Sequence, residues 1–290
     1  MKLKNKLLFL FIFSGFANLG ITAIDQSKGS FEDKFRQLDE AFPSPNLSRP
    51  ATGEPGPTYW QQRADYKIQI KLNEDSRSVE GSETITYTNN SPLTLKYIWL
   101  QLDQNIFAKE SINNLTRPWN GGDSSVDFST LRRQNFMDDF EGGFQELSIK
   151  VNNQDVKTNV VGTHVRINLN QPLSPGESTK LNIAWSYALV EENAVRARNG
   201  YETFEDGNDI FLLAQWYPRV TVFSDYEGWH NKEFIGNGEF TLEFGNFEVD
   251  ISVPSDHVVS ATGELLNESD VLSSKQRKRI KQARKSEKPL

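Results

Sequence analysis

The stretch 211–220 ends an apolar run with the groups best able to contact a ligand: an amide, two aromatic rings and a guanidinium. Gln215 precedes a Tyr-Pro break, and Arg219 follows it. Amide and guanidinium groups at the end of a buried run are costly unless they are paired or face a cleft. Two interpretations stay open on these residues alone: a strand end whose polar groups are satisfied locally, and one wall of a ligand cleft.

Metal and nucleophile chemistry has few candidates in this chain. The only histidines are His164, His230 and His257. His230 and Glu233 have the spacing of the first half of an inverted zinc motif, but Phe234 stands where a second histidine would be needed. A catalytic zinc site requires three protein ligands, and no H-E-x-x-H, G-x-S-x-G or glycine-rich phosphate loop is present. We therefore predict no catalytic residue, metal site or cofactor within this chain.

Neighbouring carboxylates occur at Asp138-Asp139 and Glu205-Asp206. A glycosidase needs two carboxylates at a set separation in one cleft, which a sequence does not show. In an acidic chain, adjacent acids are typically solvated loop residues. An independent hydrolase is therefore a less favoured hypothesis. It requires two acids that converge in one deep pocket.

The composition is that of a globular chain, with 37% hydrophobic and 24% charged residues over 290 positions. There is no cysteine, which excludes disulfides, thiolate metal sites and a lipidated cysteine. The net charge of −7 argues against a nucleic-acid partner, because the phosphate backbone would be repelled. The segment from Lys275 to Leu290 is an exception and is strongly basic, which we interpret as a solvated helix face.

Residues 1–23 have the pattern of a removable signal peptide. Lys2, Lys4 and Lys6 precede the apolar run Leu7–Phe16, and small residues follow as far as Ala23. The apolar run is too short to span a bilayer, so no transmembrane anchor is expected. We therefore predict an exported protein, periplasmic or secreted.

The rest of the chain alternates apolar and polar residues with a period of two, which indicates half-buried strands. About ten strands are expected, without a strong helix between them, and this pattern favours an all-β fold: an antiparallel, saddle-like β-sandwich with a short basic C-terminal helix capped by Ser273 or Ser274. The predicted organisation is a signal peptide at 1–23, an irregular lead-in at 24–57, a β domain at 58–265 and a basic helical segment at 266–290. The expected strands are 66–72, 79–88, 93–102, 144–151, 155–161, 164–169, 181–187, two within 238–253, and 258–262.

Five segments of the chain carry a family signal through their order. They are Tyr59–Tyr66, Val79–Pro92, Tyr97–Phe107, Ala214–Arg219, and Phe247–Pro254 with Ala261-Thr-Gly263. In this order they resemble the N-terminal domain of the aminopeptidase N family of zinc metallopeptidases, in its exported bacterial branch. The resemblance extends from about Tyr59 to Leu290. No single motif is decisive, but their order and spacing together are fairly specific.

The resemblance implies a saddle-like β domain that packs on a thermolysin-like catalytic domain. The family's G-x-M-E-N motif and H-E-x-x-H zinc helix belong to that catalytic domain and are absent here. The resemblance therefore implies a truncated enzyme, inactive alone, whose zinc would be held by the missing domain. It also implies that Gln215 contributes to the site for the substrate's free α-amine, where an amide oxygen can accept a charge-assisted hydrogen bond.

Roles other than substrate contact are expected for the neighbours of Gln215. Packing is the expected role of Trp216 and Tyr217, and a structural ion pair that of Arg219. The alternative function is a stand-alone exported peptide- or carbohydrate-binding β-sandwich. That alternative requires Trp216, Tyr226 and Trp229 to form one exposed aromatic platform.

Overall fold

The computed structural model describes residues 45–116, 126–195, 197–238 and 240–288. The predicted signal peptide and much of the predicted lead-in lie outside these residues. The chain divides into two compact units, Met1–Ser252 and Val253–Leu290. The domain boundaries expected from the sequence stay predictions. Within the described residues, no helix combines the length and the apolar character needed to cross a membrane.

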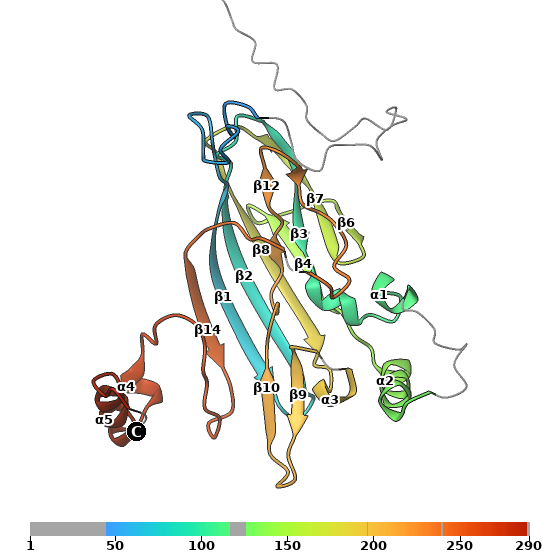
Figure 1. Cartoon of the computed structure of the whole chain (residues 1–290), viewed down its shortest axis with the longest axis vertical. Helices are drawn as coiled ribbons and strands as arrows, with labels where there is room; N and C mark the ends of the chain where they lie inside the picture. The colour runs from blue at the N-terminus through green and yellow to red at the C-terminus, as the bar shows by residue number, and fades with distance from the viewer. Residues whose placement is uncertain (1–44, 117–125, 196, 239, 289–290) are drawn as a thin grey trace, which may run out of the picture. The chain divides into compact units, whose positions relative to one another are not determined.

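The larger unit contains a six-stranded sheet whose members come from distant parts of the chain (Figure 1). Its strands, in spatial order, are β14 (Phe247–Ser252), β1 (Arg63–Asn73), β2 (Ser78–Thr88), β8 (Ser178–Ala188), β4 (Ser148–Val151) and β5 (Gln154–Asp155). All neighbouring pairs are antiparallel except β14 with β1, which is parallel. The antiparallel pairing expected from the sequence thus holds for this sheet except at the β14 edge.

In the central strands, buried and exposed side chains alternate with the same period of two residues as the apolar and polar residues of the sequence. Along β1, Tyr66, Ile68 and Ile70 are buried, whereas the lysine and glutamine residues between them are exposed. The same alternation runs through β2 and β8. At Gly81 a Cβ atom would lie 1.6 Å from the ring of Trp185, so the glycine leaves room for that indole.

A second sheet of four strands provides the opposite side of the core. Its strands, in spatial order, are β11 (Arg219–Val220), β3 (Leu95–Gln101), β7 (His164–Leu173) and β6 (Thr158–Val161). One hydrophobic cluster joins residues of both sheets, among them Ile85, Leu181, Ile98 and Ile167. The predicted all-β class with a short C-terminal helix is confirmed, and the two sheets share one core.

Two short hairpins follow β8. β9 (Gly200–Thr203) pairs with β10 (Asp209–Leu212), and β12 (Phe223–Ser224) pairs with β13 (Gly228–Trp229). The expected strand 155–161 is divided instead, because β5 joins the six-stranded sheet and β6 joins the four-stranded one.

Helical turns interrupt the strands, contrary to expectation. They are η2 (Asp103–Phe107), α1 (Ile112–Leu115), α2 (Phe128–Asp139) and α3 (Glu192–Val195). The Asp127 side chain caps α2 by accepting from the backbone of Ser129 and Thr130, at 2.8 and 3.0 Å. Only Met137 of α2 is buried, so this helix has no apolar stripe that a sequence pattern would reveal.

Two expected strands are absent from the described residues. Residues 240–246 pair only through an isolated bridge at Phe244, and residues 258–262 form no strand. In the smaller unit, α4 (Glu268–Val271) precedes α5 (Ser274–Ala283). Ser273 caps α5 in a reciprocal capping box with Gln276, which confirms the predicted basic helix and its cap.

Candidate functional site

Gln215 lies in the turn between β10 and β11 and has a left-handed backbone, with φ of 52°. A non-glycine residue with positive φ is uncommon and costs free energy, and such residues gather at functional sites. The side chain of Gln215 is half-buried, and its amide makes no hydrogen bond to another described residue. The turn therefore presents a polar amide from a constrained backbone.

Two buried amide side chains hold this turn. Gln104 in η2 donates from Nε2 to the carbonyl oxygens of Ala214 and Gln215, at 3.1 and 3.0 Å. Its Oε1 accepts from Asn199 Nδ2 at 2.9 Å, and Asn199 Oδ1 accepts from the Ala214 N–H at 3.3 Å. Gln104 and Asn199 are 3% and 5% exposed. We call these two residues the amide clamp.

Sequence reasoning did not find the amide clamp. Gln104 lies in a polar run that directly follows the apolar strand β3, and this position was the only available signal. Asn199 carried no such signal. Its partner Gln104 lies far from it in the sequence, and its contact with the Ala214 N–H depends on the direction of the Asn199 side chain. The clamp explains how an energetically costly backbone conformation persists at Gln215.

The two aromatic residues after Gln215 pack inward, as predicted. The Trp216 ring stacks with that of Trp185 at a centroid distance of 6.4 Å. The Tyr217 ring lies edge-on to that of Tyr66 at 5.5 Å. Both belong to the margin of the main core, so Gln215 projects from a rigid aromatic base.

Arg219 forms the structural ion pair that was predicted for it. Its Nη2 lies 2.7 Å from Asp103 Oδ2 and also donates to Gln101 Oε1 at 2.9 Å, while its Nε donates to Asp103 Oδ2 at 2.9 Å. Burial raises the pKa of the Asp103 carboxyl, and the Arg219 guanidinium opposes that rise. Because Asp103 belongs to the same short helix as Gln104, this pair also fixes the base of the amide clamp.

The three histidines have separate surroundings. His164 is buried at the start of β7, and burial, followed by the nearby Arg219 charge, lowers its pKa to about 4. His257 lies beside the Asp256 carboxylate in the smaller unit. Glu233 accepts the Thr163 N–H at 3.1 Å.

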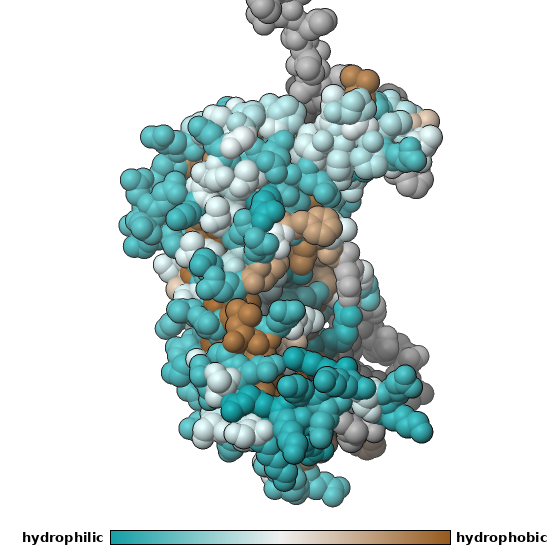
Figure 2. All heavy atoms as spheres, turned by 90° about the vertical axis from the view of Figure 1, so that its left-hand side faces the viewer, coloured by the Kyte–Doolittle hydropathy of each residue, from teal (hydrophilic) through white to brown (hydrophobic). Residues whose placement is uncertain are grey.

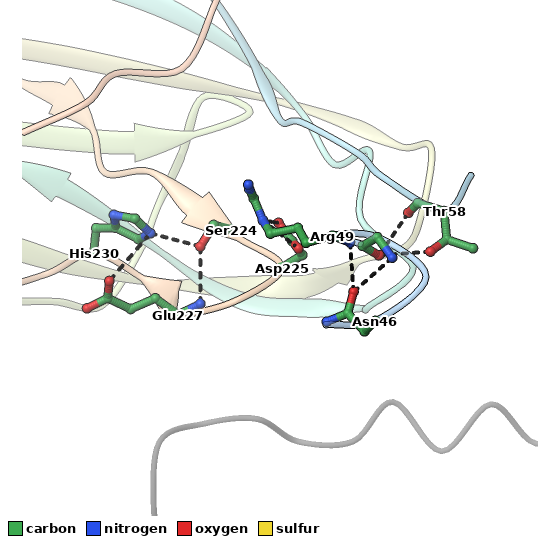
Figure 3. Close-up of polar contacts among 8 residues, drawn as sticks. Asn46, Arg49, Thr58, Ser224, Asp225, Glu227 and His230 are labelled. Atoms are coloured by element: carbon green, nitrogen blue, oxygen red, sulfur yellow. Dashed lines mark hydrogen bonds and ion pairs between the residues drawn. The ribbon is translucent and has the colours of Figure 1, made fainter. Parts of the chain in front are cut away.

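His230 instead belongs to a polar cluster at the β12–β13 hairpin (Figure 3). Its Nε2 lies 2.8 Å from Ser224 Oγ and 3.9 Å from a carboxylate oxygen of Glu227. Sequence reasoning missed this cluster. In a catalytic triad the acid orients the histidine through the nitrogen opposite the serine. Here Glu227 approaches the same nitrogen as Ser224, and the Glu227 N–H donates to Ser224 Oγ at 3.2 Å, so these contacts join the two sides of the hairpin.

The aromatic platform required by the alternative function does not form. Trp216 stacks on Trp185, whereas Trp229 stacks on Tyr87 and packs against Phe223. The Tyr226 ring is covered by the Arg49 guanidinium at 4.8 Å, and Arg49 also pairs with Asp225 at 2.9 Å (Figure 3). These three rings face different partners.

The paired acids are likewise separate. Asp138 and Asp139 end α2, whereas Asp206 accepts the Asn208 N–H within the β9–β10 turn. Glu83 is an acid buried in the core face of β2, with 4% exposure. Burial raises the pKa of Glu83 well above its usual range, and neither of its carboxyl oxygens has a hydrogen-bond partner among the described residues. Burial thus favours the protonated form of this core carboxyl.

Comparison with known proteins finds similarity only to solved structures. No protein-family model matches the chain, and no curated protein matches it. The chain is similar to an M1 zinc metallopeptidase from Deinococcus radiodurans, a mutant bound to a Tyr-Ser-Ala substrate, with 15% identity and a TM-score of 0.37 over 73% of this chain and 37% of that chain. It is also similar to another M1 zinc metallopeptidase structure from Deinococcus radiodurans, with 15% identity and a TM-score of 0.37 over 72% of this chain and 36% of that chain.

A two-domain M1 zinc metallopeptidase mutant bound to L-tryptophan is also similar, with 14% identity, a TM-score of 0.34, and coverage of 73% of this chain and 39% of that chain. The chain therefore spans less than two-fifths of the length of these structures. Likeness at this level assigns neither a family nor an activity to the chain.

Proposed function

We propose that this chain is the N-terminal β domain of an exported, zinc-dependent metallopeptidase of the aminopeptidase type. In this proposal the domain packs on a catalytic domain and contributes Gln215 to the site that binds the free α-amine of a peptide substrate. The ordered sequence segments that resemble the aminopeptidase N family support it. In this proposal residues of the catalytic domain, where the family carries its H-E-x-x-H helix, would hold the zinc.

The observation that carries the proposal is the backbone of Gln215. The amide clamp holds this residue at a φ of 52°, while its own side-chain amide makes no hydrogen bond to another described residue. A glycine would adopt this conformation at lower cost than the glutamine that occupies it. An amide on a constrained backbone is suited to accept a hydrogen bond from an ammonium group, which contributes about 1.5–3 kcal/mol.

Replacement of Gln215 separates a binding role from a structural one. Gln215→Gly should raise the free energy of unfolding by about 1 kcal/mol, because it relieves the left-handed strain. In an enzyme that contains the catalytic domain, the same variant should lower kcat/KM for substrates with a free amino terminus by about 10- to 150-fold. Gln61→Gly is a suitable control, since the Gln61 side chain is exposed and makes no hydrogen bond to another described residue.

Two further measurements test the wider proposal. The coding DNA beyond Leu290 should contain an H-E-x-x-H reading frame, and its absence would remove the metallopeptidase assignment. The chain by itself should not hydrolyse aminoacyl-anilide substrates, with or without added zinc. Zinc-dependent turnover by the chain alone would contradict the proposal.

The alternative of a stand-alone peptide- or carbohydrate-binding β-sandwich gains no specific support. Its three candidate rings at Trp216, Tyr226 and Trp229 face the core or an arginine rather than one another.

A further inference from the structure

The edge strand β14 extends the core face of the six-stranded sheet. Its parallel ladder with β1 places three apolar residues in register with three core residues. The pairs are Phe247 with Tyr66, Val249 with Ile68, and Ile251 with Ile70. Because side chains in register project from the same face of a sheet, the apolar side chains of β14 continue the hydrophobic face of β1.

Burial ends abruptly between these two strands. The three β1 residues are at most 4% exposed, whereas Phe247, Val249 and Ile251 are 49%, 38% and 40% exposed. The face viewed in Figure 2 shows patches of apolar atoms near the middle of a mostly hydrophilic surface. An apolar edge strand left uncovered is a template for pairing with another chain.

The backbone of β14 is also available at its outer edge. Within the described residues, β14 forms a ladder only with β1. Tyr66 N donates to the carbonyl oxygen of Asn246 at 2.8 Å. This hydrogen bond fixes which backbone groups of β14 face β1 and which face the free edge. Since successive residues of a strand direct their N–H groups to opposite sides, the N–H groups of Val249 and Ile251 face the free edge.

The other face of β14 is acidic. Glu248 pairs with Lys67 at 2.7 Å, whereas Asp250 has no ion-pair partner among the described residues. The sheet surface beside Asp250 is hollowed, with adjoining cavities of about 560 and 840 Å³ that also share Ser82 and Ala184 in their lining. Lys67, Lys71 and Lys150 also line these cavities, but each pairs with an acid, at 2.7, 3.0 and 3.5 Å. The Asp250 carboxylate on the rim is therefore left to attract a long basic side chain, with small side chains on the floor below it.

We propose that β14 is a docking edge for an extended peptide segment that alternates apolar residues with lysine or arginine. The segment adds to the sheet as a further strand, its apolar residues covering Phe247, Val249 and Ile251 and its basic residues facing Asp250. A second copy of β14 is a poorer occupant. Antiparallel pairing about Val249 would set Glu248 of each copy beside Asp250 of the other, and opposed like charges are destabilising. This inference does not depend on Gln215.

A synthetic peptide of about nine residues that alternates valine and lysine is the probe, since strands of this length match the edge. Its binding to the full chain is measured by fluorescence anisotropy, beside a valine–glutamate peptide and a scrambled valine–lysine peptide. Only the alternating basic peptide should bind. It should slow amide exchange at Val249 and Ile251, whereas exchange at Asp250, whose N–H faces β1, should change little.

Variants of the edge test each part of the proposal. Asp250→Lys should weaken binding of the basic peptide about tenfold and favour the acidic one. Ile251→Lys should also weaken binding, whereas Ile210→Lys, a matched change at an exposed residue of β10, should not. Val249→Pro should abolish binding and preserve the fold, because it removes an N–H that faces the free edge.

The proposal would be overturned by equal binding of the acidic and basic peptides, by no binding of any peptide at millimolar concentration, or by exchange protection away from β14. Concentration-dependent dimers in sedimentation that Ile251→Lys dissolves would overturn it in favour of a second copy.

Discussion

Substitution Gln104→Glu tests whether the amide clamp determines the shape of the Gln215 turn. At neutral pH a carboxylate has no N–H to donate, so the carbonyl oxygens of Ala214 and Gln215 lose the donors now at 3.1 and 3.0 Å. The new carboxylate would still accept from Asn199 Nδ2. Each buried group left unsatisfied costs about 1–3 kcal/mol, so the two carbonyls together predict a loss of about 2–6 kcal/mol of unfolding free energy.

The loss should depend on pH in a defined direction. A buried carboxyl that donates to a carbonyl when protonated has a pKa above its unfolded value near 4.3. The native variant therefore retains its proton to higher pH than the unfolded chain does. Its stability should be greatest below about pH 4 and should fall as the pH rises through the folded pKa.

Urea unfolding followed by tryptophan fluorescence at pH 4 and pH 7 measures both effects. Gln61→Glu is the control, because its side chain is exposed and its change should stay within about 0.5 kcal/mol. If Gln104→Glu matches this control at pH 7, or loses as much stability at pH 4 as at pH 7 relative to the control, the clamp does not act as described.

Three further substitutions probe the rest of the larger unit. Burial raises the pKa of Glu243 to about 7 from an ordinary 4.5, so its contribution to stability should fall by about 3 kcal/mol as pH rises through that interval. Glu243→Gln should remove this pH dependence in urea titrations, and an unchanged profile would refute the assignment. Gly81→Ala should destabilise by about 1–3 kcal/mol or more, because its Cβ would overlap the Trp185 ring; an unchanged Tm would show that the indole has room to move. Asp103→Leu should cost about 3–5 kcal/mol by leaving Arg219 charged and unpaired, whereas the double variant with Arg219→Met should recover much of that loss. A double variant no more stable than Asp103→Leu would contradict this reading.

The strands of the main sheet were predictable because burial alternates with the side-chain direction. Ile68 and Ile70 face the core, and the polar residues beside them face solvent. The same rule failed at residues 240–246, where Phe240 anchors a loop by packing against His164 and Phe234 at 6.5 and 6.0 Å. Alternation thus identifies buried side chains but does not distinguish a ladder from an anchored loop.

The helix α2 and the parallel edge were not predictable for different reasons. α2 has a local polar cap at Asp127 and almost no buried face, so its signal is absent from hydrophobic periodicity. The direction of β14 beside β1 depends on the path of the intervening chain rather than on either strand's own residues.

The candidate site was predictable in part. Gln215 could be singled out because an amide stands at the end of an apolar run. Its left-handed backbone and the amide clamp could not be predicted, because Gln104 is 111 positions away from Gln215. Arg219 was assigned to an ion pair from its expected burial, but its partner Asp103 required the structure.

The parallel pairing of β14 with β1 has a consequence for the order of folding. During synthesis β1, β2 and β8 leave the ribosome well before β14, so the central ladder can form while its outer member is still absent. Closing contacts across so long a separation in sequence is slow. We therefore expect β14 to join the sheet last and to leave it first, as the least protected strand in native-state hydrogen exchange.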